Sequence, residues 1–396
     1  MKPTRTCAHT LPNAHRLLPS TWPVGGEAVG RSWGCGARAL PYSSPRLAVC
    51  RPGPAQIRPG LPLSLPPSPP PPFRARPRSC GRAVCMQLQL LLTVSKMSTH
   101  NKVKVFLISL SMVTFVIMVV MNGAAGSGAF KGIFQRTVGN ISNKYNTDVT
   151  PAGWTFLIWN IIYLWQLAWL GYALSGICRR NELGWFYVKP DVLPTPFYLV
   201  WILNNALNVG WLFLWDKECL SHALLVLTGL TVSNYAILFL ACRGLSSHRL
   251  WLQSHHRTDL WLLRVLVQNG IALYATWTTV ATLLNFAIVL IYTVGVANST
   301  STTVVLSILL MLLVLWFYLE NFLLDKYVHY ILVVYPVVMI ALTGNIAQHY
   351  DPSAPSTNNI FTVVLLVVTS VMFLVRLGLV TCRHRYQRLW KDPQRG

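Results

Sequence analysis

Aromatic and amide residues recur at helical spacing along three apolar stretches of the chain. Trp159, Tyr163 and Gln166 are separated by four and three residues, so they share one face of a helix. Two further stripes keep this spacing: Trp201, Asn204, Asn208, Trp211 and Trp215 form one, and Tyr274, Trp277, Ala281, Asn285, Ile288 and Tyr292 form the other. Rings offer stacking area and amides orient a ligand without a charge, which suits a flat and mostly apolar molecule. The three stripes therefore predict a binding pocket.

Ten residues of these stripes are expected to line that pocket. They are Trp159, Tyr163, Gln166, Asn204, Asn208, Trp211, Tyr274, Trp277, Ala281 and Asn285. The small Ala281 would leave room for a ring system on the wall that also carries Trp277 and Asn285.

A purely structural interpretation of the same residues stays open. Tryptophan is enriched at bilayer interfaces, where Trp154, Trp165, Trp169 and Trp215 would form a belt. An asparagine within a span often only bonds a neighbouring helix, at about 0.6 kcal/mol. A small residue such as Ala281 can serve only to let two helices approach closely.

Chemistry of other kinds is not indicated. The sequence holds no nucleophile elbow, no phosphate-binding loop, no paired-carboxylate site and no C-x-x-C pair. His248, His255 and His256 occur in one basic segment, but the adjacent pair lacks the spacing of helical metal ligands. A basic loop that meets anionic lipid headgroups is the simpler interpretation. We therefore expect no enzymatic activity, no catalytic residue, no metal and no cofactor.

The elements that position the stripes must be membrane spans. Of the 396 residues, 53% are hydrophobic and 11% are charged, whereas a soluble domain carries about 25% charged residues. A span needs about 20 apolar residues, and eight runs qualify: 104–124, 153–176, 195–215, 220–242, 265–293, 303–322, 328–347 and 360–381. The alternating pattern of a membrane barrel is absent. The sequence predicts an all-α polytopic membrane helix bundle with about eight transmembrane helices.

The charge distribution predicts how the bundle is oriented. With the start of the first span placed inside, sixteen Lys and Arg residues beyond residue 100 fall on inside segments and four on outside segments. Cytoplasmic loops carry such an excess of basic residues, so both termini are expected to be cytoplasmic. The sequons at Asn140 and Asn298 both fall in outside loops. Plasma membrane, endomembrane and mitochondrial membrane all stay open.

Three stretches, in this order, resemble the tryptophan-rich sensory protein or translocator protein family, also called the peripheral benzodiazepine receptor family. The first is Pro151-Ala-Gly-Trp-Thr-Phe-Leu-Ile-Trp-Asn-Ile-Ile-Tyr163, and the second is Leu207-Asn-Val-Gly-Trp-Leu-Phe-Leu-Trp215. The third, Leu273-Tyr-Ala-Thr-Trp-Thr-Thr-Val-Ala-Thr-Leu-Leu-Asn285, is similar to the family pattern P-Y-x-x-W-x-x-x-A-x-x-L-N, with Leu273 in place of the proline. The resemblance covers about residues 104–293 and indicates a divergent, longer relative.

This resemblance implies a function without catalysis. The family binds porphyrins and sterols, so a porphyrin or sterol ligand and membrane lipids are the expected partners, with transport or sensing as an extension. Two alternatives stay open, an ion or solute transporter or channel that uses spans six to eight, and a structural membrane protein whose pocket has closed. No basic face typical of a nucleic-acid-binding protein is visible, and oligomerisation is left open.

The domain organisation follows from these segments. Residues 1–96 hold 17 of the 25 prolines and are rich in arginine, so we expect a disordered and dispensable extension. A transit peptide or an SH3 ligand are alternatives for this segment. We then expect a five-span translocator-protein-like bundle over 97–293, three additional transmembrane helices over 294–382 and a basic cytoplasmic tail over 383–396.

Ionisable residues are nearly absent from the predicted spans. Arg264 and Arg376 lie near predicted cytoplasmic ends, where their side chains are expected to reach the interface. Glu320 and Asp325 flank the exit of the sixth span beside Lys326 and His329. We expect a solvated helix end there, with a gate or ion site as the alternative.

Overall fold

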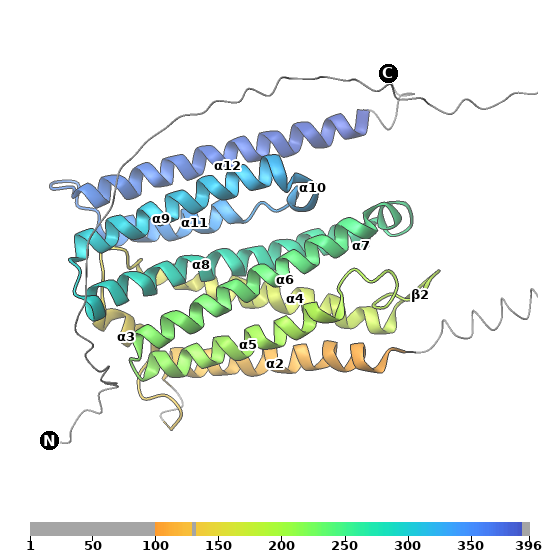
Figure 1. The fold of residues 1–396 in the computed structure, drawn as a ribbon, viewed down its shortest axis with the longest axis horizontal. Coiled ribbons are helices and arrows are strands. Elements are labelled where there is room, and N and C mark those ends of the chain that lie inside the picture. The colour runs from red at the N-terminus through yellow and green to blue at the C-terminus, as the bar shows by residue number, and fades with distance from the viewer. Residues whose placement is uncertain (1–99, 129–131, 390–396) are drawn as a thin grey trace, which may run out of the picture. The chain divides into compact units, whose positions relative to one another are not determined.

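The computed structural model describes residues 100–128 and 132–389 as a bundle of long helices (Figure 1). The long helices are α2 (Lys102–Ser127), α4 (Ile158–Cys178), α5 (Thr195–Asp216), α6 (Leu220–His255), α8 (Asn269–Val289), α9 (Asn298–Tyr318), α11 (Val334–His349) and α12 (Thr357–Leu389). Shorter helices are α3 (Val138–Lys144), α7 (Arg257–Leu262) and α10 (Asp325–Val328), and a two-stranded antiparallel hairpin joins β1 (Arg180–Asn181) to β2 (Gly184–Trp185). The extension expected over 1–96 and the last seven residues of the tail lie outside the described residues.

Seven of the described helical segments are long and apolar enough to cross a membrane. They correspond to the first six predicted spans and the last one, which confirms an all-α polytopic membrane protein. The span predicted over 328–347 is the exception. Helix there starts only at Val334, and the 16-residue α11 is about 24 Å long at 1.5 Å per residue.

Two side chains from neighbouring helices explain why α11 begins later than predicted. The Arg376 guanidinium of α12 donates hydrogen bonds to the carbonyl oxygens of Val328 and His329, each over 3.1 Å. Asn269 of α8 also accepts a hydrogen bond from the Leu332 amide. Backbone groups that a continuous helix would use internally are therefore bonded to neighbouring helices, and a connection replaces the predicted first turns.

Local sequence signals set the ends of α2. The Asn101 side chain accepts a hydrogen bond from the Lys104 amide and caps the first turn. At the other end Gly128 adopts a left-handed conformation with φ of 68°, and its amide bonds the Ala124 carbonyl. Glycine takes this conformation without the penalty that a Cβ brings, so the helix stops there.

Helix α8 is the centre of the bundle, because it contacts α4, α6, α9 and α11. Of its 21 residues, 15 are buried. One apolar core joins α8 to α2, α4, α5 and α6, and a second joins it to α9, α11 and α12. The π-helical turns η2 (Leu263–Gln268) and η3 (Leu290–Val294) extend it at both ends. Side chains on α8 can therefore reach both halves of the bundle.

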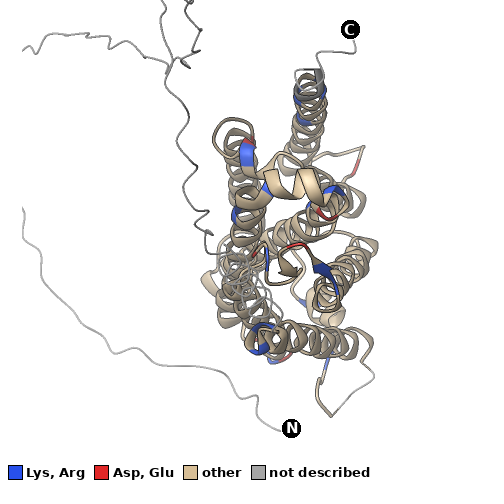
Figure 2. Cartoon of the chain, turned by 90° about the vertical axis from the view of Figure 1, so that its right-hand side faces the viewer, with Lys and Arg blue, Asp and Glu red and all other residues tan. Residues whose placement is uncertain are grey.

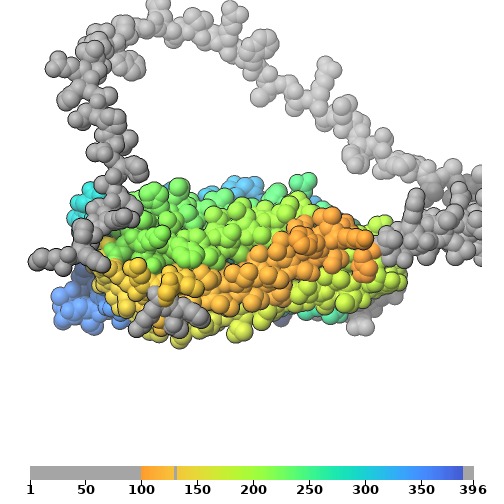
Figure 3. Space-filling view, turned by 90° about the horizontal axis from the view of Figure 1, so that it is seen from below, coloured from red at the N-terminus to blue at the C-terminus, as the bar shows by residue number. Residues whose placement is uncertain are grey.

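The outer faces of the helices are apolar, as a lipid environment requires. Helix α2 lies along one outside face (Figure 3) and exposes Phe106, Val113, Ile117 and Val120 there. Figure 2 faces the end of the bundle that carries the start of α2 and the β1–β2 hairpin, and several lysine and arginine residues are visible on it. We refer to this end as the basic end.

Candidate functional site

Aromatic rings of α4 and α8 meet inside the bundle. Trp159 contacts Tyr163, Tyr274 and Trp277, with ring centroids 5.6, 6.1 and 6.2 Å apart. Tyr274 and Trp277 are buried, whereas Trp159 and Tyr163 are half-buried. We call these four residues the ring group. It joins two of the predicted stripes and reaches the bundle surface on the α4 side.

The predicted amides of α5 bond three neighbouring helices. Asn208 donates to the Tyr274 hydroxyl over 3.0 Å and accepts a hydrogen bond from Asn122 of α2 over 2.7 Å. Asn204 donates to Ser233 and Asn234 of α6 over 2.8 and 3.0 Å. The predicted stripe on α5 is thus connected to the ring group through the hydrogen bond between Asn208 and Tyr274. These contacts also fit the structural interpretation of intramembrane asparagines.

Gln166 closes the side of the ring group that faces the basic end. Its side chain donates to the Gly270 carbonyl over 2.8 Å and accepts a hydrogen bond from the Trp169 indole. A Cβ placed on Gly270 would lie 2.7 Å from the Trp165 ring. The absence of a side chain at this position therefore allows α4 and α8 to approach closely enough for their rings to meet.

Ala281 and Asn285 continue the same face of α8 beyond Trp277. Ala281 is half-buried against the central apolar core, and Asn285 donates to the Ala281 carbonyl. The indole nitrogen of Trp277 and the side-chain oxygen of Asn285 are both buried without a hydrogen-bond partner in the protein. Unpartnered buried polar atoms are costly, so this face suits a ligand that carries its own polar groups.

Trp211 lies outside the ring group, although it also packs against the central apolar core. It stacks on Trp215 at 5.4 Å and packs against apolar clusters at the opposite end of α5 from the basic end. The belt interpretation is wrong for Trp169 and Trp215, which are buried in the protein, whereas Trp154 is exposed. Trp169 instead packs against Trp201 at 4.9 Å.

A cleft lies on the other side of α8. It encloses about 490 Å³, counted with its open mouth. Its walls come from α6, α8, α9 and α11 and include Tyr235, Thr279 and Trp316. None of the ten predicted site residues lines it.

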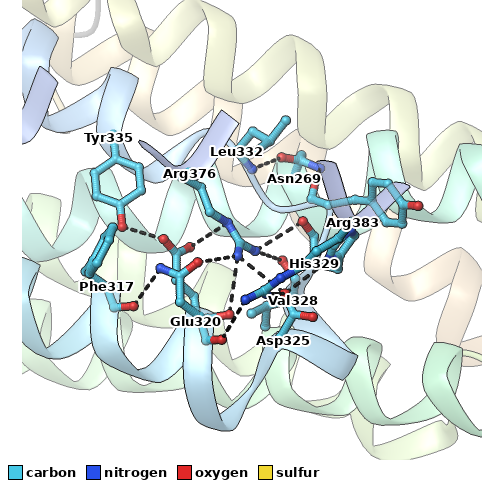
Figure 4. Close-up of polar contacts among 12 residues, drawn as sticks. Asn269, Phe317, Glu320, Asp325, Val328, His329, Leu332, Tyr335, Arg376 and Arg383 are labelled. Atoms are coloured by element: carbon cyan, nitrogen blue, oxygen red, sulfur yellow. Dashed lines mark hydrogen bonds and ion pairs between the residues drawn. The ribbon is translucent and has the colours of Figure 1, made fainter. Parts of the chain in front are cut away.

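A charge cluster at the last three helices is buried, although the sequence led us to expect exposed side chains there. The Arg376 and Glu320 side chains are fully buried, and the Arg376 Nε lies 3.5 Å from a Glu320 oxygen. Arg376 also donates to the Glu320 carbonyl and to the Asn321 side chain (Figure 4). The expectation of a solvated helix end, with Arg376 reaching the interface, is therefore wrong. Glu320 lies in the π-helical turn η4 (Leu319–Leu323), which turns it inward.

Asp325 and His329 form the less buried edge of this cluster. His329 Nδ1 lies 2.9 Å from Asp325, and Arg383 lies 2.6 Å from the same carboxylate. Burial alone would raise the pKa of Asp325, but the bond to His329 and the charge of Arg383 hold it below its usual value. Burial also lowers the pKa of His329, despite the neighbouring carboxylate.

One signal in the sequence could have identified this cluster. Arg376 interrupts an otherwise apolar run. Glu320 follows the apolar run of the sixth predicted span and precedes a segment rich in tyrosine. A charge within a membrane span usually faces the protein interior and a partner, which is the arrangement seen here. Among residues 100–128 and 132–389, no three His, Cys, Asp or Glu side chains lie together as metal ligands would.

Comparison with known proteins gives one result. A family model described as TSPO-like protein matches residues 108–377. The match continues beyond residue 293, so the family similarity includes the last three spans and not only the first five. No curated protein and no solved structure matches the chain.

Proposed function

Because the chain belongs to the TSPO-like protein family, we propose that this integral membrane protein binds a porphyrin or sterol ligand without transforming it chemically. The proposed site is the ring group together with Ala281 and Asn285 on the same face of α8. Transport or sensing of the bound molecule would follow from that binding.

One observation carries the proposal. The Trp277 indole N–H is buried and unpartnered, and it lies beside a ring wall that reaches the bundle surface through the half-buried Trp159 and Tyr163. A sterol hydroxyl or a porphyrin carboxylate supplies an acceptor for this N–H, and its apolar body packs on the rings. The half-buried edge on α4 offers such a ligand a route from the lipid phase.

Filling the α8 face should block binding. We expect Ala281→Phe to weaken protoporphyrin binding at least tenfold, because a ring at this position would cover the α8 face beside Trp277. Trp277→Phe keeps an aromatic ring but removes the N–H, whose hydrogen bond is worth about 0.5–1.5 kcal/mol, so we expect up to about tenfold weaker binding. Quenching of tryptophan fluorescence during titration of the purified full chain measures both effects.

The control is Leu164→Phe, which adds a ring to a side chain 68% exposed on the lipid face of α4. Its affinity should equal that of the unmodified chain. Non-saturable quenching, or equal affinities for Ala281→Phe and Leu164→Phe, would overturn the proposed site.

We also propose that the basic end faces the cytoplasm, with both termini on that side. Lysine and arginine residues are visible on this end (Figure 2), and Arg136, Lys144 and Lys217 are the predicted outside residues at the opposite end. The two sequons then face the opposite compartment. Asn140 is exposed on α3, whereas Asn298 exchanges hydrogen bonds with Asp148 through its side-chain amide.

Glycosylation tests this orientation. In a eukaryotic cell we expect a glycosidase-sensitive mobility shift that Asn140→Gln abolishes and Asn298→Gln preserves, because Asn140 is exposed whereas the Asn298 amide is bonded to Asp148. A mitochondrial location gives no shift at all. A shift that persists in Asn140→Gln would contradict the accessibility argument, and modification of a sequon placed at the basic end would contradict the orientation.

The transporter alternative gains no support from the buried charges. The Arg376 guanidinium bonds η4, α10 and the connection to α11 at once. Such an arrangement holds three segments together, and a mobile carrier group would need some of these donors free.

A further inference from the structure

A second cavity lies at the basic end of the bundle, next to the π-helical turn η2 that precedes α8, and none of the ring-group residues lines it. It encloses about 300 Å³, counted with its open mouth, between α6, η2 and the α10 segment. Three cations, Arg249, Arg264 and Lys326, line it, and no carboxylate does.

These cations lack the partners that such side chains normally have. Among the described residues 100–128 and 132–389, no carboxylate lies in ion-pair distance of Arg249, Arg264 or Lys326. Arg264 is only 7% exposed, and its guanidinium lies over the rings of Trp261 and Tyr330 at 4.9 and 4.1 Å. A buried cation that is held only by ring faces is attractive to an anion.

A polar wall completes the cavity. His329 is 8% exposed, and its Nδ1 is used by Asp325, while its Nε2 is buried without a partner. Gln268 and Ser246 contribute an amide and a hydroxyl to the same lining. Because Nδ1 donates to the Asp325 carboxylate, Nε2 can donate as well only in the charged imidazolium form. An anionic oxygen in the cavity would favour that form and would accept hydrogen bonds from the three cations.

We propose that this cavity binds the phosphate group of an anionic phospholipid. The side chains next to two of its cations are apolar and exposed, since Leu250 is 80% and Val265 is 47% exposed. They offer contact to acyl chains, which a free phosphate does not have. Basic cavities between helices on the cytoplasmic side are typical sites for lipid headgroups. This binding is separate from that of the porphyrin or sterol ligand.

Binding of short-chain phosphatidic acid to the full chain in neutral detergent tests the proposal, for example by native mass spectrometry. Phosphatidylcholine with the same chains should bind at least tenfold more weakly. An Arg249→Gln and Lys326→Gln double variant should lose about thirtyfold in affinity for phosphatidic acid, since each charge near an anionic surface contributes about 1 kcal/mol and about 1.4 kcal/mol corresponds to tenfold. Both side chains are at least partly exposed, so the variant should fold.

The matched control is Arg257→Gln, an exposed arginine of α7 that does not line the cavity. Its affinity for phosphatidic acid should stay unchanged, and Arg264→Gln should lose binding further. Inorganic phosphate and glycerol 3-phosphate form the second arm. If they bind as tightly as the lipid, or if the double variant equals Arg257→Gln, the proposal is overturned.

Discussion

Replacing Arg376 with methionine is expected to destabilise the folded protein by about 3–5 kcal/mol. The side chains of Arg376 and Glu320 are fully buried. Loss of the guanidinium leaves the Glu320 carboxylate buried without a cation. The carbonyls of Val328 and His329 lose the donors that hold them. Thermal or denaturant unfolding of the purified protein measures the loss.

Two further variants separate the buried charge from a general effect of substitution. Arg383→Gln removes an ion pair with Asp325 from a side chain that is 36% exposed, and it should cost less than about 1 kcal/mol. The double variant Arg376→Met with Glu320→Gln leaves no unpaired buried charge, so it should recover much of the stability. Equal losses for Arg376→Met and Arg383→Gln would contradict the described burial.

The second large effect is expected at Gly244. A Cβ at this position of α6 would lie 2.0 Å from the Val192 carbonyl oxygen, a backbone atom that no rotamer change can move away. The segment before α5 would have to shift, together with Asp191, which pairs with the buried Lys104 of α2. We expect Gly244→Ala to destabilise the protein by about 3 kcal/mol or more.

Gly378→Ala is the matched control for this prediction. Gly378 also lies in a helix, but nothing occupies the space within 4 Å of its Cβ position. Replacing a helical glycine by alanine then stabilises by about 0.5–1 kcal/mol. A melting temperature of Gly244→Ala at or above that of Gly378→Ala would show that α6 and the Val192 segment do not pack as described.

The long helices could be predicted because each contains an apolar run close to membrane length. The start of α11 could not, since side chains from elsewhere in the chain, Asn269 and Arg376, bond the backbone before it. The π-helical turns could not be predicted either, because one extra residue in a helical turn leaves the pattern of apolar residues almost unchanged. Glu320 lies in such a turn and is buried.

The candidate site was likewise predictable within each helix but not between helices. Helical spacing correctly placed Trp159 with Tyr163 and Tyr274 with Trp277, because residues on one face of one helix stay together. Spacing says nothing about the relative rotation of different helices or their height. Asn208 therefore bonds Tyr274 of the ring group, whereas the ring of Trp211 on the same stripe stacks on Trp215. The sequence also could not show which tryptophans of the expected interface belt would be buried: Trp154 is exposed, whereas Trp169 is buried in the protein.

The most direct measurement of the central proposal is the location of a bound ligand. A photoreactive porphyrin or sterol analogue can be cross-linked to the full chain in lipid nanodiscs, and the modified peptides identified by mass spectrometry. The account predicts labels on α4 and α8 around Trp159 and Ala281, displaced by excess unlabelled ligand and lost in Ala281→Phe. Displaceable labelling confined to the cleft between α6 and α9, or labelling that excess ligand does not displace, would contradict it.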